Sequence, residues 1–172
     1  CFWLRAFEIP EAQKTSMGKA IQNLVHIPKE DKVRAYIMIE DLTDEAYINS
    51  HYLVFCTKKG VIKKTIVEAF SRPRINGINA ITIHEGDQLL EVKLTNGQSE
   101  VLLANKNGRA IRFNETKVRA MGRSAAGVSG MKLDDENDEI IGLVTVDPTD
   151  PTTTILVISA KGNGKRSSLE DY

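Results

Sequence analysis

The chain has 172 residues, and its 23 basic side chains balance 23 acidic ones. The zero net charge argues mildly against a nucleic-acid binder, because such proteins usually carry an excess of Lys and Arg. Apolar runs stay well below the roughly 20 residues of a membrane span, and there is no signal peptide, so we expect a cytoplasmic protein without a membrane partner. The start Cys1-Phe2-Trp3 is not a natural one, and we expect a piece of a longer protein.

In chain order, short apolar runs bounded by Gly, Asn, Asp and Pro predict strands. These runs lie at residues 33–39, 53–56, 89–94, 101–104, 140–146 and 155–158. Three of them, 53–56, 101–104 and 155–158, are continuously apolar, which is typical of inner strands covered on both faces. Helical signals are short and lie at 43–48 and 167–172. Cys1 and Cys56 are too few for a disulfide framework or a zinc site.

One landmark recurs at intervals of about 50 residues, a period typical of propeller-like arrays. Residues 52–65, 100–113 and 154–167 align, with a glycine at the same place in each: Gly60, Gly108 and Gly162. Asn107-Gly108 lies between two apolar runs and predicts a two-residue hairpin turn, in which both residues have positive φ. Each aligned segment is therefore expected to form a hairpin.

A second landmark follows each hairpin and contains Gly18, Gly77 or Gly127, then an acidic turn and another apolar run. We therefore expect residues 1–40 to hold part of one blade, 51–97 and 99–147 to form whole blades, and 153–172 to begin another. The predicted fold is all-β, a propeller-like array of four-stranded blades. A sandwich of unrelated hairpins is the alternative, and the two recurring landmarks argue against it.

Basic residues cluster between the two landmarks of each copy, while acidic residues cluster elsewhere, as at 134–139. Equivalent positions of a radial array share one rim, so we expect a basic stripe with the acidic turns away from it. An extended stripe suits a polyanion, and the scarcity of aromatic residues favours duplex over single-stranded DNA. The candidate DNA-binding residues are Lys58, Lys59, Lys63, Lys64, Arg72, Arg74, Lys106, Arg109, Arg112, Lys117, Arg119, Arg123, Lys161, Lys165 and Arg166.

Other functions find little support in these residues. Gly162-Asn-Gly-Lys-Arg-Ser167 departs from a phosphate-binding loop, because Ser159 replaces the leading glycine and Arg166 separates Lys165 from the serine. No catalytic nucleophile with a base and no metal-ligand spacing is visible. Solvated hairpin charges and a propeller-like protein-interaction module remain as alternatives.

Four motifs in order resemble the C-terminal domain of the DNA gyrase A subunit, over essentially the whole chain. They lie at residues 60–65, 105–113, 118–130 and 162–167. The resemblance implies a six-bladed β-pinwheel whose blades exchange strands, with double-stranded DNA wrapped around its basic perimeter. The domain itself would be non-catalytic, and about half of the expected blades would be present.

The resemblance also implies a parent type IIA topoisomerase that supercoils DNA negatively at the expense of ATP. The gyrase A subunit would work with the gyrase B subunit in an A2B2 holoenzyme, and ATP and Mg would be bound by other parts, so no cofactor is expected here. The family's glutamine-, arginine- and glycine-rich box is not in these residues and should precede Cys1. Its absence leaves a close alternative, the C-terminal domain of the topoisomerase IV A subunit. This piece alone is expected to wrap DNA poorly.

Overall fold

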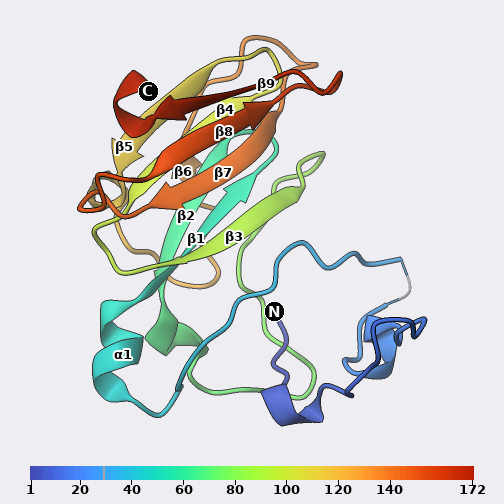
Figure 1. Ribbon diagram of the computed structural model, residues 1–172. Helices are drawn as coiled ribbons and strands as arrows, with labels where there is room; N and C mark the ends of the chain where they lie inside the picture. Colours follow the sequence, from blue (N-terminus) through green and yellow to red (C-terminus); the bar gives the residue numbers. More distant parts are fainter. Residues whose placement is uncertain (29) are drawn as a thin grey trace.

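The computed structural model describes residues 1–28 and 30–172, and in them it is built from antiparallel strands (Figure 1). A four-stranded sheet has the order β3-β1-β2-β6, a three-stranded sheet the order β5-β4-β7, and β8 pairs with β9. We call these sheets the first, second and third blades. The strands are β1 Tyr52–Thr57, β2 Val61–Ile66, β3 Leu89–Thr95, β4 Glu100–Asn105, β5 Ala110–Asn114, β6 Val128–Ser129, β7 Ile140–Val146, β8 Thr154–Ile158 and β9 Gly164–Ser168.

Short helices lie at the ends of the hairpins. The single α-helix of the described residues, α1 (Glu45–Ser50), precedes β1 and is capped by Asp44, whose carboxylate accepts hydrogen bonds from two backbone N–H groups. A 3-10 helix follows the second strand of each hairpin. The 3-10 helices are η1 Ala6–Glu8, η2 Ile21–Asn23, η3 Val67–Phe70, η4 Glu115–Lys117 and η5 Leu169–Asp171.

The three blades are built on one register. Their hairpins begin with the pairs Tyr52–Ile66, Glu100–Asn114 and Thr154–Ser168. In the first two blades a further strand pairs with the first hairpin strand, β3 on β1 and β7 on β4, each with a register shift at the end near the hairpin turn. The predicted array of repeated β-units is therefore present in the structure.

The hairpin turns differ from the predicted two-residue type. Gly60, Gly108 and Gly162 have φ of 85°, 87° and 82°, but no other residue type has positive φ in the described chain, so Asn107 does not. Instead, the N–H of Gly108 donates to the carbonyl of Asn105 at 3.2 Å, and the N–H of Asn105 donates to the carbonyl of Arg109 at 2.9 Å. These bonds close a three-residue loop in which only the glycine needs the left-handed region. The prediction of two positive φ angles was wrong.

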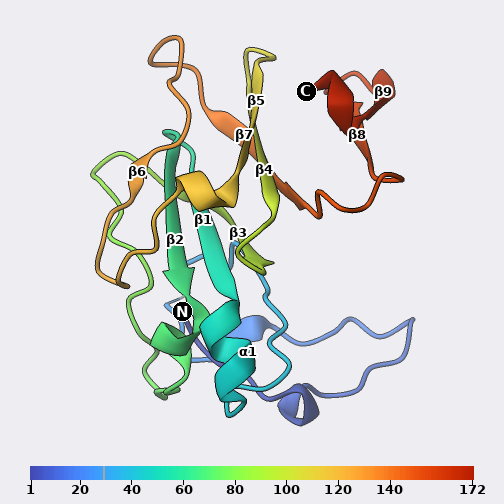
Figure 2. The ribbon, with the colours of Figure 1, turned by 90° about the vertical axis from the view of Figure 1, so that its left-hand side faces the viewer.

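The outer strand of the first blade comes from the second repeat. β6 pairs with β2 through Val61–Ser129 and Ile62–Val128, although β6 follows β5 in the chain (Figure 2). This added strand covers an edge of β2 that would otherwise leave backbone groups unpaired. The exchange of strands between blades, implied by the family resemblance, is confirmed.

Gly127 marks the place where the second repeat reaches the first blade. It has φ of 110°, and a Cβ built there would lie 2.6 Å from the carbonyl oxygen of Ile62. Gly77 has the same role one repeat earlier, since its Cβ would lie 2.7 Å from the carbonyl oxygen of Cys1. Gly18 has φ of 70° but no atom within 4 Å of a built Cβ, so it shows no such close approach.

Two apolar clusters hold the blades. The first lies between the first and second sheets and includes Val54, Ile62, Leu103 and Ile140. The second lies on the other face of the first sheet, where Phe55 and Phe70 pack with parts of the N-terminal segment and of the 71–84 loop. Burial on both faces explains the continuously apolar strands β1 and β4.

Residues 33–39 do not form the strand that was predicted for them. The structure assigns no strand to the described residues before β1. The alternation is nevertheless used, because Ala35, Ile37 and Ile39 pack against the second cluster while Tyr36 and Met38 face solvent. One-sided burial produces a period of two without a hydrogen-bonded partner strand, which is why the pattern misled the prediction.

The close approach at Gly127 predicts the effect of an alanine there. Positive φ alone costs alanine about 1 kcal/mol, and the clash with the Ile62 carbonyl should raise the loss for Gly127→Ala to about 2–4 kcal/mol. Gly108→Ala is the matched control, since it shares the positive φ but meets no atom within 4 Å. Urea unfolding measures both, and equal losses would contradict the proposed contact.

Candidate nucleic-acid interface

The structure divides the fifteen candidate basic residues into three groups by location. Five lie in or beside hairpin turns: Lys58, Lys59, Lys106, Arg109 and Lys161. Five lie on second hairpin strands: Lys63, Lys64, Arg112, Lys165 and Arg166. Five lie in the segments after those strands: Arg72, Arg74, Lys117, Arg119 and Arg123. The three groups have different surroundings.

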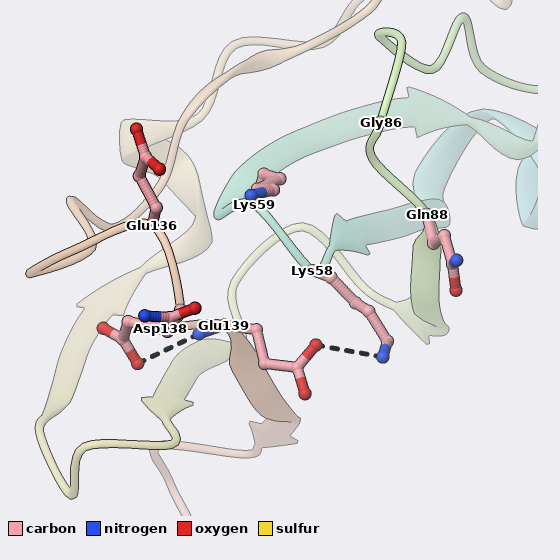
Figure 3. A pocket seen from close by; sticks show the side chains of 8 residues that line it. Lys58, Lys59, Gly86, Gln88, Glu136, Asp138 and Glu139 are labelled. Carbon is pink, nitrogen blue, oxygen red and sulfur yellow. Dashed lines mark hydrogen bonds and ion pairs between the residues drawn. The ribbon is translucent and has the colours of Figure 1, made fainter.

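Two residues of the turn group pair with the acidic turn at residues 134–139. Lys58 Nζ is 3.0 Å from Glu139 Oε2, and Arg109 forms an ion pair with Asp134. Figure 3 shows the ammonium of Lys58 beside the carboxylate of Glu139; both residues line a polar pocket together with Lys59, Glu136 and Asp138. The hydrogen bond from Lys58, together with its charge, lowers the pKa of Glu139. The expectation that acidic turns lie away from the basic residues is wrong, because they partly neutralise the hairpin turns.

Lys63 is fully buried rather than exposed on a rim. Its Nζ donates to the backbone carbonyls of Ala80 at 2.6 Å and Arg123 at 2.5 Å, and the ammonium lies 5.4 Å from the centre of the Phe55 ring. A charged group removed from water needs such compensation. The structure therefore corrects the prediction for Lys63, which joins two loops instead of facing a ligand.

Lys64 is also buried, with 6% of its surface exposed. Its Nζ donates to the carbonyl of Glu115 at 2.8 Å and lies 3.8 Å from the Glu115 carboxylate. That carboxylate also accepts hydrogen bonds from Thr95 Oγ1 and the N–H of Ser99, each at 2.8 Å. The prediction of a surface contact is corrected here too, since Lys64 belongs to a buried polar network between the first and second blades.

Arg112 donates to the backbone carbonyl of Leu169 in the third blade, and its Nε lies 3.6 Å from Glu100 Oε2. Lys165 and Arg166 are exposed on β9. Within this strand group, the residues of the first two blades thus have partners inside the protein.

The third group lies on two loops that meet along the outer side of the first blade. Thr82 Oγ1 donates to the carbonyl of Ser124 at 2.7 Å, and the N–H of Thr82 donates to the carbonyl of Ala125 at 3.3 Å. We call residues 71–84 and 117–127 the paired basic loops; Figure 2 shows both beside β2 and β6. These hydrogen bonds join the two loops and so place basic residues that are far apart in the sequence on the same side of the blade.

The basic side chains of these loops differ as a group from the other ten candidates, of which Lys58, Lys64, Arg109 and Arg112 are ion-paired. Arg72, Arg74, Lys117 and Arg119 are exposed, and Arg123 is half-buried. Within the part of the chain that the structure describes, none of the five has an acidic partner within ion-pair distance. Their positive charge is therefore available to an external anion.

The sequence reasoning missed Glu115 as a structural residue. It is the one acidic residue between Lys106 and Arg123. Its side chain is fully buried and contacts Lys64, Thr95 and Ser99. A single acid kept within a basic run was the available signal for a buried ion pair.

The described residues offer no metal site, and the thiol of the core is buried. They contain no group of three His, Cys, Asp or Glu side chains arranged to hold a metal ion. Burial raises the pKa of the Cys56 thiol to about 12, so it is an unreactive core residue. Among the helices of the described chain, none has the length and apolar character needed to span a membrane.

Burial of Lys63 predicts a specific pH dependence of stability. Desolvation lowers its pKa from 10.5 to about 8, and a neutral amine keeps two N–H donors for its two carbonyl acceptors. Between these pH values the unfolded chain holds the proton and the folded chain does not, so folding stability rises with pH. In urea unfolding, the stability of the natural protein relative to Lys63→Met should therefore rise from about pH 8 to about pH 10. A constant difference across that window would show that Lys63 is not desolvated.

Comparisons with known proteins agree with this architecture. A family model described as "DNA gyrase C-terminal domain, beta-propeller" matches residues 51–96, 99–147 and 153–172. The DNA gyrase A subunit of Staphylococcus aureus strain NCTC 8325 / PS 47 is 36% identical over 169 residues, which cover 98% of this chain. The match spans 18% of the length of that relative.

Two solved structures share the fold. The C-terminal domain of DNA topoisomerase IV superposes with a TM-score of 0.81 at 29% identity, covering 96% of this chain and 49% of that one. The C-terminal domain of DNA gyrase A gives a TM-score of 0.75 at 26% identity, covering 97% of this chain and 50% of that one. The all-β, propeller-like fold is thus confirmed, and the chain belongs to the DNA gyrase C-terminal domain family.

Proposed function

We propose that this chain binds double-stranded DNA on its paired basic loops and helps to wrap it, as a non-catalytic part of a type IIA topoisomerase. The observation that carries the proposal is the meeting of two exposed basic loops from consecutive repeats, with no acidic partners for their basic side chains among the described residues. Family membership supports the same reading.

The chemistry of the loops favours the DNA backbone over the bases. Exposed Arg and Lys side chains contact phosphates without sequence information, and phosphate contacts position a duplex. The loops carry no Phe, Tyr or Trp side chain on which bases would stack. DNA bound here would follow the outer side of the blades, where equivalent loops of successive repeats lie.

The function of the whole protein follows from the family as part of the proposal. The gyrase A subunit would assemble with the gyrase B subunit into an A2B2 complex in the cytoplasm, and ATP-driven strand passage on wrapped DNA would introduce negative supercoils. ATP and Mg would bind to other parts of that holoenzyme. The 36% identity to a gyrase A over nearly the whole chain favours gyrase, although the topoisomerase IV domain superposes with the higher of the two TM-scores.

If the paired basic loops bind DNA, removing their cations should make the duplex affinity less dependent on salt. Each phosphate contact contributes about −0.9 to the slope of log affinity against log salt. Replacing Arg72, Arg74, Lys117 and Arg119 together by Ala should therefore make the slope shallower by about 3.6 and weaken duplex binding by about tenfold or more at moderate salt. Fluorescence anisotropy with a duplex across a salt series measures both quantities.

The control replaces the ion-paired residues Lys58 and Arg109 by Ala, because these two already have carboxylate partners. This variant should change the salt slope by less than the value of about 0.9 that one phosphate contact contributes. Equal effects of the two variants would refute the assignment to the loops, and an unchanged quadruple variant would favour a protein-interaction module instead.

A further inference from the structure

Lys64 and Arg112 occupy the same position in consecutive blades. Lys64 lies opposite Val54 in the first hairpin, and Arg112 lies opposite Leu102 in the second. Arg166 lies opposite Leu156 in the third hairpin, so it is the third member of the series. A basic residue therefore stands at one register position of all three second strands.

The two inner members bind equivalent acceptors in the following blade. Lys64 Nζ donates to the carbonyl of Glu115, the first residue of η4, and Arg112 Nη1 donates to the carbonyl of Leu169, the first residue of η5. Both helices begin directly after the second hairpin strand of their blade. The same donor position thus meets the same acceptor position twice, across two different blade junctions.

The acceptor carbonyl has capacity for this second bond. Within the helices, the carbonyl of Glu115 accepts from the N–H of Val118 at 3.0 Å, and that of Leu169 accepts from the N–H of Tyr172 at 3.4 Å. A carbonyl oxygen has two lone pairs, so the long basic side chain uses the remaining one. A carboxylate balances each cation: Glu115 lies near Lys64 and Glu100 near Arg112.

The Lys64 contact also bears on the loop that follows η4. The backbone carbonyl of Lys64 accepts from the N–H of Met121 at 2.8 Å, while its side chain holds Glu115. One residue of the first blade therefore fixes both ends of the segment 115–121. That segment carries Lys117 and Arg119, two of the exposed cations of the paired basic loops.

We propose that Lys64 and Arg112 are inter-blade tethers: positioning residues that set where the next blade and its basic loop lie, and not phosphate contacts. Only the DNA readout of this inference rests on the proposed function. The tether itself is a property of the blade junction and is tested independently of DNA.

The test compares Lys64→Met, Lys64→Arg and Lys117→Met in the natural protein. Lys64→Met keeps most of the length of the side chain but removes the donor, so amide hydrogen exchange in residues 115–121 should rise at least tenfold while β8 and β9 are unchanged. Duplex affinity should fall several-fold with an unchanged salt slope. Lys64→Arg introduces the residue type that the other two blades have at this position, and it should restore both the slow exchange and the duplex affinity. Lys117→Met is the matched control: it should make the slope shallower by about 0.9 without changing exchange.

The proposal would be overturned if Lys64→Met made the salt slope shallower, as Lys117→Met does, and left amide exchange unchanged. It would also be overturned if Lys64→Met changed neither the exchange nor the duplex affinity. If Lys64→Met does not fold, Arg112→Met gives the same test at the more exposed junction, with exchange read in residues 169–172. Should the protein bind no duplex at all, the proposed function fails, and the exchange experiment still decides on the tether.

Discussion

The backbone pairing of β6 with β2 is the interaction on which the rest of the structure depends. The first hairpin leaves the outer edge of β2 without a partner, and the following repeat supplies the missing strand. The close approach needs a residue without a side chain, which Gly127 provides beside the Ile62 carbonyl. Because the strand arrives from the next repeat, the loop before it is drawn to the outside of the preceding blade, beside residues 71–84.

This exchange explains how a chain with no net charge presents a basic surface. The acidic turns lie at the hairpin-turn end, where they pair with Lys58 and Arg109. Two further cations, Lys63 and Lys64, are used inside the protein to join loops and blades. All five basic side chains of the paired basic loops lack an acidic partner among the described residues. The location of charge, and not its total, therefore defines the candidate DNA track.

Much of the fold could be predicted from the sequence, and less of the site. Periodic glycines and apolar runs located every hairpin, because backbone requirements leave a direct mark on residue type. Burial of Lys63 and Lys64 left no such mark. A strand of alternating exposure would place one of two neighbouring lysines outside, but the carbonyls of Ala80 and Arg123 meet the side chain of Lys63, and Glu115 meets that of Lys64. Long-range partners such as Glu115 and the Arg123 carbonyl decide which cations are free, and spacing alone does not report them.

The most direct test of this account is amide hydrogen exchange of the protein with and without a DNA duplex. The account predicts that DNA slows exchange in the paired basic loops, residues 71–84 and 117–127, and leaves the ion-paired hairpin turns at 57–60 and 105–109 unchanged. Protection confined to the hairpin turns, with the loops unaffected, would contradict it and would place the DNA track at the other end of the blades.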